Sequence, residues 1–144
     1  MFDTRLTRWI TQAVHNSFDD FDVPVLHTPT DRTKYSQCIE VRVHGPNYRR
    51  VSGGWKVQVF VNVLVTAIRT SDKYAMERIL GLVVNVLGAP IVVRQTGFDS
   101  DEDLTTVGCL SPTGDVKIDN QGTFQQSTAM QATAENVFYM DIKE

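Results

Sequence analysis

Residues Trp55 to Ala67 alternate without a break between apolar and mixed side chains. Every odd position is apolar, and these positions are Trp55, Val57, Val59, Val61, Val63, Val65 and Ala67. A period of two places these side chains on one face of an extended chain, and β-branched residues favour a pleated sheet over a helix. At ~3.3 Å per residue such a strand runs for roughly 45 Å, which is long for a small domain. The chain is therefore predicted to be built around one long β-strand.

The opposite face of this strand carries a second, sparser apolar stripe. Phe60, Leu64 and Ile68 lie on it, separated by amide and hydroxyl side chains. A monomer seldom leaves such a stripe open along its longest strand. Either the C-terminal segment covers it, through Phe124 or Phe138, or another subunit does. We expect the second, and predict a subunit interface at Phe60, Leu64 and Ile68.

Two amphipathic helices are predicted, one on each side of the long strand in the sequence. Residues Thr4–Phe18 have apolar side chains at three- and four-residue spacing, and Asp3 or Thr4 can cap the helix. Residues Lys73–Leu87 carry a broader apolar stripe, and Gly88 followed by Pro90 is typical of a helix end.

The remaining apolar runs are short and predict further strands. They are Val23–Leu26, Tyr35–His44, Ile91–Arg94, Leu104–Leu110, Val116–Ile118 and Val137–Ile142. Gly45-Pro46-Asn47 is expected to end its strand, Tyr48–Gly54 to form a polar connection, and Asn120–Thr133 to form a loop. Together these elements predict one α+β domain over residues 1–144, with an antiparallel or mixed sheet and two helices packed on one face.

Composition narrows the class of protein. The chain has 144 residues, 42% of them hydrophobic, and a net charge of −3, which disfavours a main role in gripping phosphate backbones. Cys38 and Cys109 are expected to be reduced thiols. The N-terminus has no apolar leader, and the apolar windows are too short and interrupted for a bilayer. We expect a protein that is made and kept in a cytoplasm, or in a particle that forms there.

No pattern of catalytic or metal-ligating residues is recognisable. His15, His27 and His44 lie in three different predicted elements, at no spacing typical of a metal site. The acidic run Asp99–Asp103 lacks the glycine and distal glutamate of a calcium loop. A metal triad assembled by the fold, and a cysteine–histidine nucleophile, remain alternatives. We expect no catalytic residues, no metal and no cofactor.

The segment Tyr48-Arg49-Arg50 is the most basic part of the chain. Such a segment contacts nucleic acid phosphates, meets an acidic protein surface, or is simply a solvated hairpin end. We predict an intersubunit contact for Tyr48, Arg49 and Arg50, with Asp99, Asp101 and Asp103 of a neighbouring copy as the acidic partners.

The order of these elements resembles the tail terminator, or tail-completion, proteins of long-tailed bacteriophages. The resemblance is carried by Trp55–Asn62, Asp72–Pro90 and Val137–Ile142, and Asn120–Thr133 departs from it. It implies a homo-oligomeric ring, commonly a hexamer, in the tail or neck of a virion assembled in the host cytoplasm. The implied partners are further copies of the chain, the tail tube protein and head–tail connector proteins. DNA would only pass through the ring, no membrane is involved, and the family supplies no catalytic residues.

Two alternatives stay open beside this one. Another neck or connector protein with a similar sheet would show the same order of elements. A small α+β enzyme or ligand-binding domain would instead use a pocket between the sheet and the helices.

Overall fold

The computed structural model describes residues 2–27, 37–68, 74–95, 105–123 and 129–143. Two α-helices are present in this part of the chain, α1 (Leu6–Asn16) and α2 (Ala75–Leu87). The strands are β1 (Val25–Leu26), β2 (Gln37–Val51), β3 (Gly54–Ile68), β4 (Ile91–Arg94), β5 (Thr106–Pro112), β6 (Lys117–Thr123) and β7 (Ala129–Lys143). Both predicted helices are confirmed with slightly shorter bounds, as are the predicted long strand and the short strand Ile91–Arg94.

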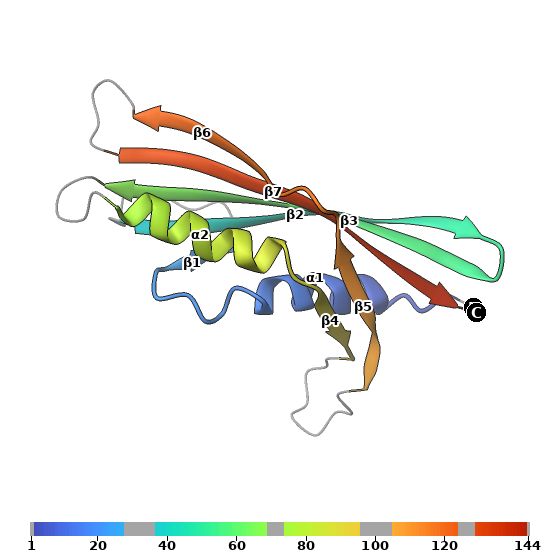
Figure 1. Ribbon diagram of the computed structural model, residues 1–144. Coiled ribbons are helices and arrows are strands. Elements are labelled where there is room, and N and C mark those ends of the chain that lie inside the picture. The colour runs from blue at the N-terminus through green and yellow to red at the C-terminus, as the bar shows by residue number, and fades with distance from the viewer. Residues whose placement is uncertain (1, 28–36, 69–73, 96–104, 124–128, 144) are drawn as a thin grey trace.

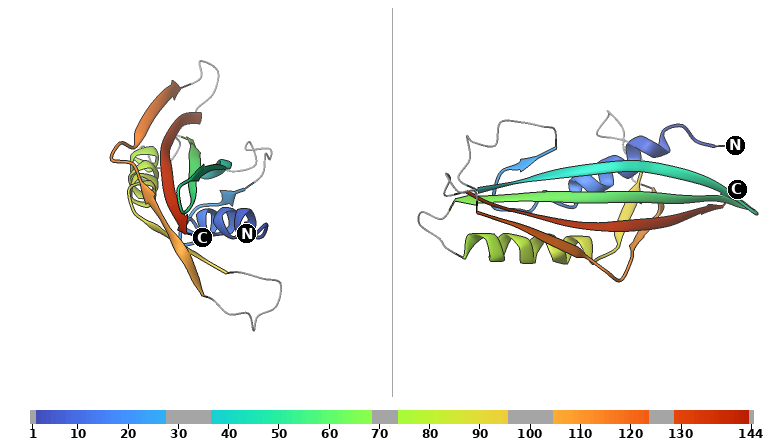
Figure 2. Two further views of the ribbon diagram at one scale, coloured as in Figure 1. Left: turned by 90° about the vertical axis from the view of Figure 1, so that its right-hand side faces the viewer. Right: turned by 90° about the horizontal axis from the view of Figure 1, so that it is seen from above.

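One mixed sheet runs through the molecule in the order β1-β2-β3-β7-β5-β4, and β6 pairs with β7 beside β5. Strand β1 is parallel to β2, whereas the other pairs are antiparallel. The sheet is strongly curled, so that β4 and β5 turn away from the long strands toward helix α1 (Figures 1 and 2).

The core lies between the helices and one face of this sheet. The odd-numbered residues of β3, from Val57 to Val65, are completely buried there. Helix α1 contributes Ile10 and Val14, the turn after it contributes Phe18, and α2 contributes Ile79, Val83 and Leu87. The α+β fold with a mixed sheet and two helices on one face is therefore as predicted from the periodicities.

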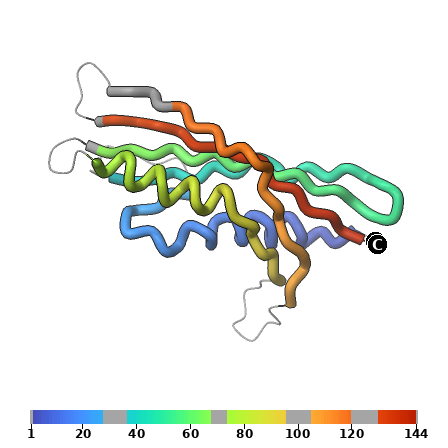
Figure 3. The backbone as a smooth tube through the Cα atoms, in the orientation of Figure 1, coloured from blue at the N-terminus to red at the C-terminus, as the bar shows by residue number. Residues whose placement is uncertain are grey.

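Strands β2, β3 and β7 each have 15 residues, and together they form the long axis of the molecule. At the ends near Val51, Gly54 and Lys143 they continue past the helical layer as a three-stranded ribbon (Figures 1 and 3). We call this ribbon, residues 47–58 and 139–143, the arm. A Cβ on Gly54 would lie 1.9 Å from the Ile142 carbonyl oxygen, so only glycine lets β7 approach the hairpin this closely.

The prediction that Gly45-Pro46-Asn47 ends a strand is wrong. Strand β2 passes through this segment to Val51, with a shift of register between His44 and Asn47. Gly45 has φ +99°, a conformation that L side chains rarely adopt, and so it allows a bulge that removes Pro46 from the ladder. The predicted polar connection Tyr48–Gly54 is thus mostly paired strand.

The predicted loop Asn120–Thr133 is wrong at both of its ends, because β6 reaches Thr123 and β7 begins at Ala129. Residues 124–128 lie outside the described residues. The N-terminal half of β7 buries Ala132 and Ala134 in the core, beneath helix α2. Alanine is not a typical strand residue, but its small side chain allows the close approach of a helix. The face of β7 that meets the core here is therefore formed by small side chains.

A buried asparagine joins three elements on the core face of β7. Asn136 is 3% exposed, and its Nδ2 donates to the carbonyl oxygens of Leu87, at 2.8 Å, and Thr113, at 3.1 Å. Its Oδ1 accepts from the Val137 amide at 2.8 Å and from the Thr113 hydroxyl. The last turn of α2, the segment between β5 and β6, and β7 are thereby held at one point.

Candidate subunit interface

The predicted apolar stripe on the second face of β3 is only partly open. Phe60 is half-buried, and its ring lies 5.6 Å from that of His44, its neighbour on β2. Leu64 is only 5% exposed within a single chain. The side chain of Ile68 lies outside the described residues. The expectation that Leu64 faces solvent until another subunit covers it is therefore wrong.

Polar side chains share this face with Leu64. Glu40 is 4% exposed, and its carboxylate accepts from Arg42 Nε at 2.9 Å and Nη2 at 2.7 Å. Asn62 donates to Glu135 at 3.2 Å. Phe138, considered from the sequence as a cover, is completely buried on the other face in the core, and Phe124 lies outside the described residues. This face is thus a mixed, partly buried surface rather than an apolar stripe.

Tyr48 is engaged within its own chain. Its hydroxyl is 2.6 Å from the Thr7 hydroxyl on α1, and its ring meets Phe2 edge-on at 4.7 Å. Burial raises the pKa of Tyr48 above its ordinary value, and the hydrogen bond with Thr7 lowers it by less. Because Phe2 also contacts Trp55 at 5.5 Å, these aromatic rings fasten the arm to the start of α1.

Arg49 and Arg50 lie on opposite faces of the arm, as successive strand residues must. Arg49 is opposite Lys56 in the register and lines a hollow of about 350 Å³ with Gln58 and Tyr139. The Arg50 guanidinium lies 5.1 Å above the Trp55 ring, a cation–π contact.

The acidic partners predicted for these arginines, Asp99, Asp101 and Asp103, lie outside the described residues. Their pairing with the arm of another copy stays a prediction.

Both edges of the arm have backbone groups without a strand partner in the described residues. Strand β2 pairs with β1 only at Ile39 and Glu40, so its edge from Val41 to Val51 has no such partner. On the other side, β5 and β6 pair with β7 no further than Tyr139, which leaves Met140–Lys143 paired to β3 alone. Open strand edges are templates for pairing with another chain.

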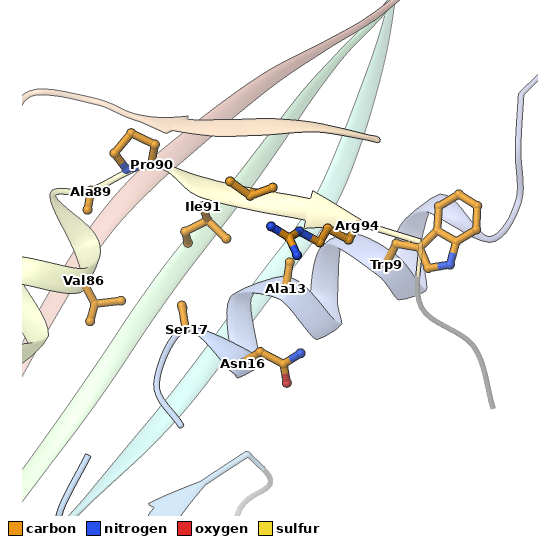
Figure 4. A pocket seen from close by; sticks show the side chains of 10 residues that line it. Trp9, Ala13, Asn16, Ser17, Val86, Ala89, Pro90, Ile91 and Arg94 are labelled. Carbon is orange, nitrogen blue, oxygen red and sulfur yellow. The ribbon is translucent and has the colours of Figure 1, made fainter. Parts of the chain in front are cut away.

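Figure 4 shows a hollow of about 470 Å³ between helix α1 and strand β4, at the end of α2. Its walls are mostly apolar and include Trp9, Ala13, Val86 and Ile91, and Arg94 projects from β4 toward α1. Val92, which also lines the hollow, is 47% exposed. Such a hollow suits an apolar group that carries a negative charge, either on a protein or on a small ligand.

The fold also brings together two histidines that are far apart in the sequence. The rings of His15 and His27 have their centroids 4.3 Å apart. No spacing in the sequence indicated this, because the contact depends on how the chain returns from α1 through β1. Over the described ranges, no group of three or more His, Cys, Asp or Glu side chains is placed to hold a metal ion.

Neither helix in the described part of the chain is long and apolar enough to cross a membrane. No protein-family model matches this sequence, and no curated protein matches it either.

Proposed function

We propose that this chain is a structural virion subunit that assembles with copies of itself into a ring, closing the tail tube of a long-tailed bacteriophage. In this proposal the ring joins the tube to the head through connector proteins, and DNA passes through it. The chain has no catalytic role. The observation that carries the proposal is the arm, a projecting ribbon with an open edge on each side.

The arm favours a ring over a symmetric dimer for a geometric reason. It lies at one end of an elongated molecule, so a neighbour that receives it uses a different part of its own surface (Figure 1). Such head-to-tail contacts give a closed ring where the rotation between neighbours closes on itself, and an open filament where it does not. Backbone pairing along an open edge supplies affinity, and side chains on the arm supply specificity. The order of elements that resembles tail terminators supports the same assembly.

Native mass spectrometry of the purified chain tests this proposal first. We expect one closed oligomer, with six copies as the expected number, that persists on dilution to low micromolar concentration. Light scattering after size exclusion provides an independent mass. A chain that stays monomeric at every concentration contradicts the proposal.

The two arginines of the arm provide a matched pair of variants. Arg49→Glu places a carboxylate on the face that presents Lys56 and Tyr139, and Arg50→Glu removes the cation above Trp55. We expect Arg49→Glu to weaken assembly about tenfold or more, because several copies of the contact are lost in each ring. Its melting temperature should change little, because Arg49 is exposed. Arg50→Glu is expected to lower stability slightly by loss of the cation–π contact.

Analytical ultracentrifugation of the two variants at matched concentrations checks this expectation. Unchanged assembly of Arg49→Glu shows that this face of the arm does not meet a neighbour. If Arg49→Glu instead abolishes a measurable affinity for duplex DNA and leaves the oligomer intact, the arm is a nucleic acid surface.

The hollow between α1 and β4 supports a second candidate function, the binding of a small apolar carboxylate. Arg94 would pair with the carboxylate, and the apolar walls would hold the rest of the ligand. Fluorescence titration with fatty acids of increasing length, using the wild type and Arg94→Ala, tests it. Saturable binding by a monomeric chain, lost in Arg94→Ala, favours this function over the ring.

A further inference from the structure

We propose that His15 and His27 together bind one divalent transition-metal ion of the zinc, nickel or copper class. The proposed site is a pocket of about 360 Å³ beside the open edge of β2. His15 stands in the last turn of α1, and His27 directly follows β1. The inference does not depend on the ring, because both residues belong to one chain.

The first observation is an imidazole nitrogen without a partner. His15 Nδ1 is buried and makes no hydrogen bond. A buried polar atom left unpaired is unfavourable, and each such atom in a folded protein calls for an explanation. The second observation is the neighbouring ring. His27 meets His15 edge-on, with an interplanar angle of 73° and 4.3 Å between centroids. Two imidazoles at this separation are close enough to share one ion after a small rotation of the exposed His27 side chain.

Burial and the neighbouring imidazole both disfavour a positive charge on the His15 ring. Burial is the largest cause that lowers the pKa of His15, a charged His27 lowers it further, and Asp19 raises it by less. A neutral imidazole has the free lone pair that a metal requires. A metal ion between the rings would give the unpaired His15 Nδ1 a partner.

The other residues that line the pocket limit which protein ligands a metal ion has there. Thr11, Val41 and Val43 form part of the wall, and Glu40, Arg42 and His44 complete it. The Glu40 carboxylate is engaged by Arg42 at 2.7 Å. Two imidazoles thus supply the protein ligands in this proposal, and water fills the other positions. Imidazole selects copper, nickel and zinc, whereas magnesium and calcium prefer oxygen.

The test uses the full chain without a histidine tag, first treated with a chelator and then freed of it. Calorimetric titration with ZnCl₂ at neutral pH is expected to show one ion per chain, and thermal denaturation a rise in Tm of about 5 °C at saturation. The affinity should follow the order copper, nickel, zinc, with no binding of magnesium or calcium. This expectation replaces the sequence-based prediction that metal ions do not affect the protein.

Three single variants locate the site. His15→Ala and His27→Ala should each abolish the rise in Tm caused by zinc, compared with the same variant in chelator. His44→Ala is the matched control, because His44 lines the same pocket but packs its ring against that of Phe60. It should keep the full metal effect. His27 is exposed, so His27→Ala folds even if the half-buried His15 position does not tolerate alanine.

Two results would overturn the proposal. One is a zinc effect that survives in His27→Ala, which places the ion elsewhere on the chain. The other is an absence of any metal effect in the wild type. If the Tm then depends on pH and His15→Ala removes that dependence, the pair is a proton-binding element. Neither result affects the ring, whose mass is measured separately in chelator.

Discussion

Asn136→Asp is expected to lower the free energy of unfolding by about 3–5 kcal/mol at neutral pH. The native amide donates to two carbonyl oxygens, those of Leu87 and Thr113. An aspartate of the same shape has no donor to offer, and it places a buried charge against both oxygens. Protonation of that carboxyl at acid pH restores one donor, so the destabilisation should become smaller as the pH falls. Urea unfolding at pH 7 and pH 4 measures both effects.

Thr113→Val is the control for this prediction. It removes one hydroxyl that donates to Asn136 and leaves the two carbonyl contacts in place. We expect a loss of about 1 kcal/mol, within the usual range for one hydrogen bond. A similar small loss for Asn136→Asp would contradict the role of Asn136 as the point that joins α2, the segment after β5, and β7.

The elements that were predicted correctly from the sequence are those indicated by residues close to one another in the chain. The valine alternation of β3 and the apolar stripes of α1 and α2 follow from side chains at regular spacing, and the structure keeps all three. The packing of both helices on the valine face also follows, because that face is the most apolar surface available. Periodicity was therefore sufficient for the fold class.

The elements missed depend on partners that are far away in the sequence. Strand β2 continues through Gly45 and Pro46 because β3 is already there to pair with it on both sides of the bulge. Strand β7 begins early because β3 pairs with it along its whole length, from Ile68 opposite Ala129 to Gly54 opposite Lys143. Rules that predict strand ends from Gly and Pro, or loops from a polar composition, do not contain information about this pairing.

The candidate site was predictable only in part, for the same reason. Alternation correctly placed Phe60 and Leu64 on the face away from the helices, but it does not give the exposure of that face. Likewise, nothing in the spacing of His15 and His27 indicates that their rings meet. The two arginines of the arm were found as a basic segment, whereas their separation onto opposite faces required the register of β2.

Leu64→Lys is expected to lower the free energy of unfolding by about 3 kcal/mol or more, and not merely to dissociate an oligomer. Leu64 is 5% exposed, so the substitution removes a buried apolar side chain and introduces a charge with little access to water. The buried Glu40 is opposite Leu64 in the register, but Arg42 already engages its carboxylate, so compensation should be small. Chemical denaturation of the variant measures the loss directly.

Ile118→Lys is the matched control, since Ile118 also lies on a strand but is 52% exposed. Its free energy of unfolding should change by no more than about 0.5 kcal/mol, the usual range for surface substitutions. Leu64→Met, which keeps the apolar character and nearly the volume, should lose less than about 1.5 kcal/mol. If Leu64→Lys instead keeps the stability of the wild type and sediments as a monomer, Leu64 is a contact between subunits after all. In that case copies of the chain meet through Leu64 and its neighbours on this face of β3, and not through the arm.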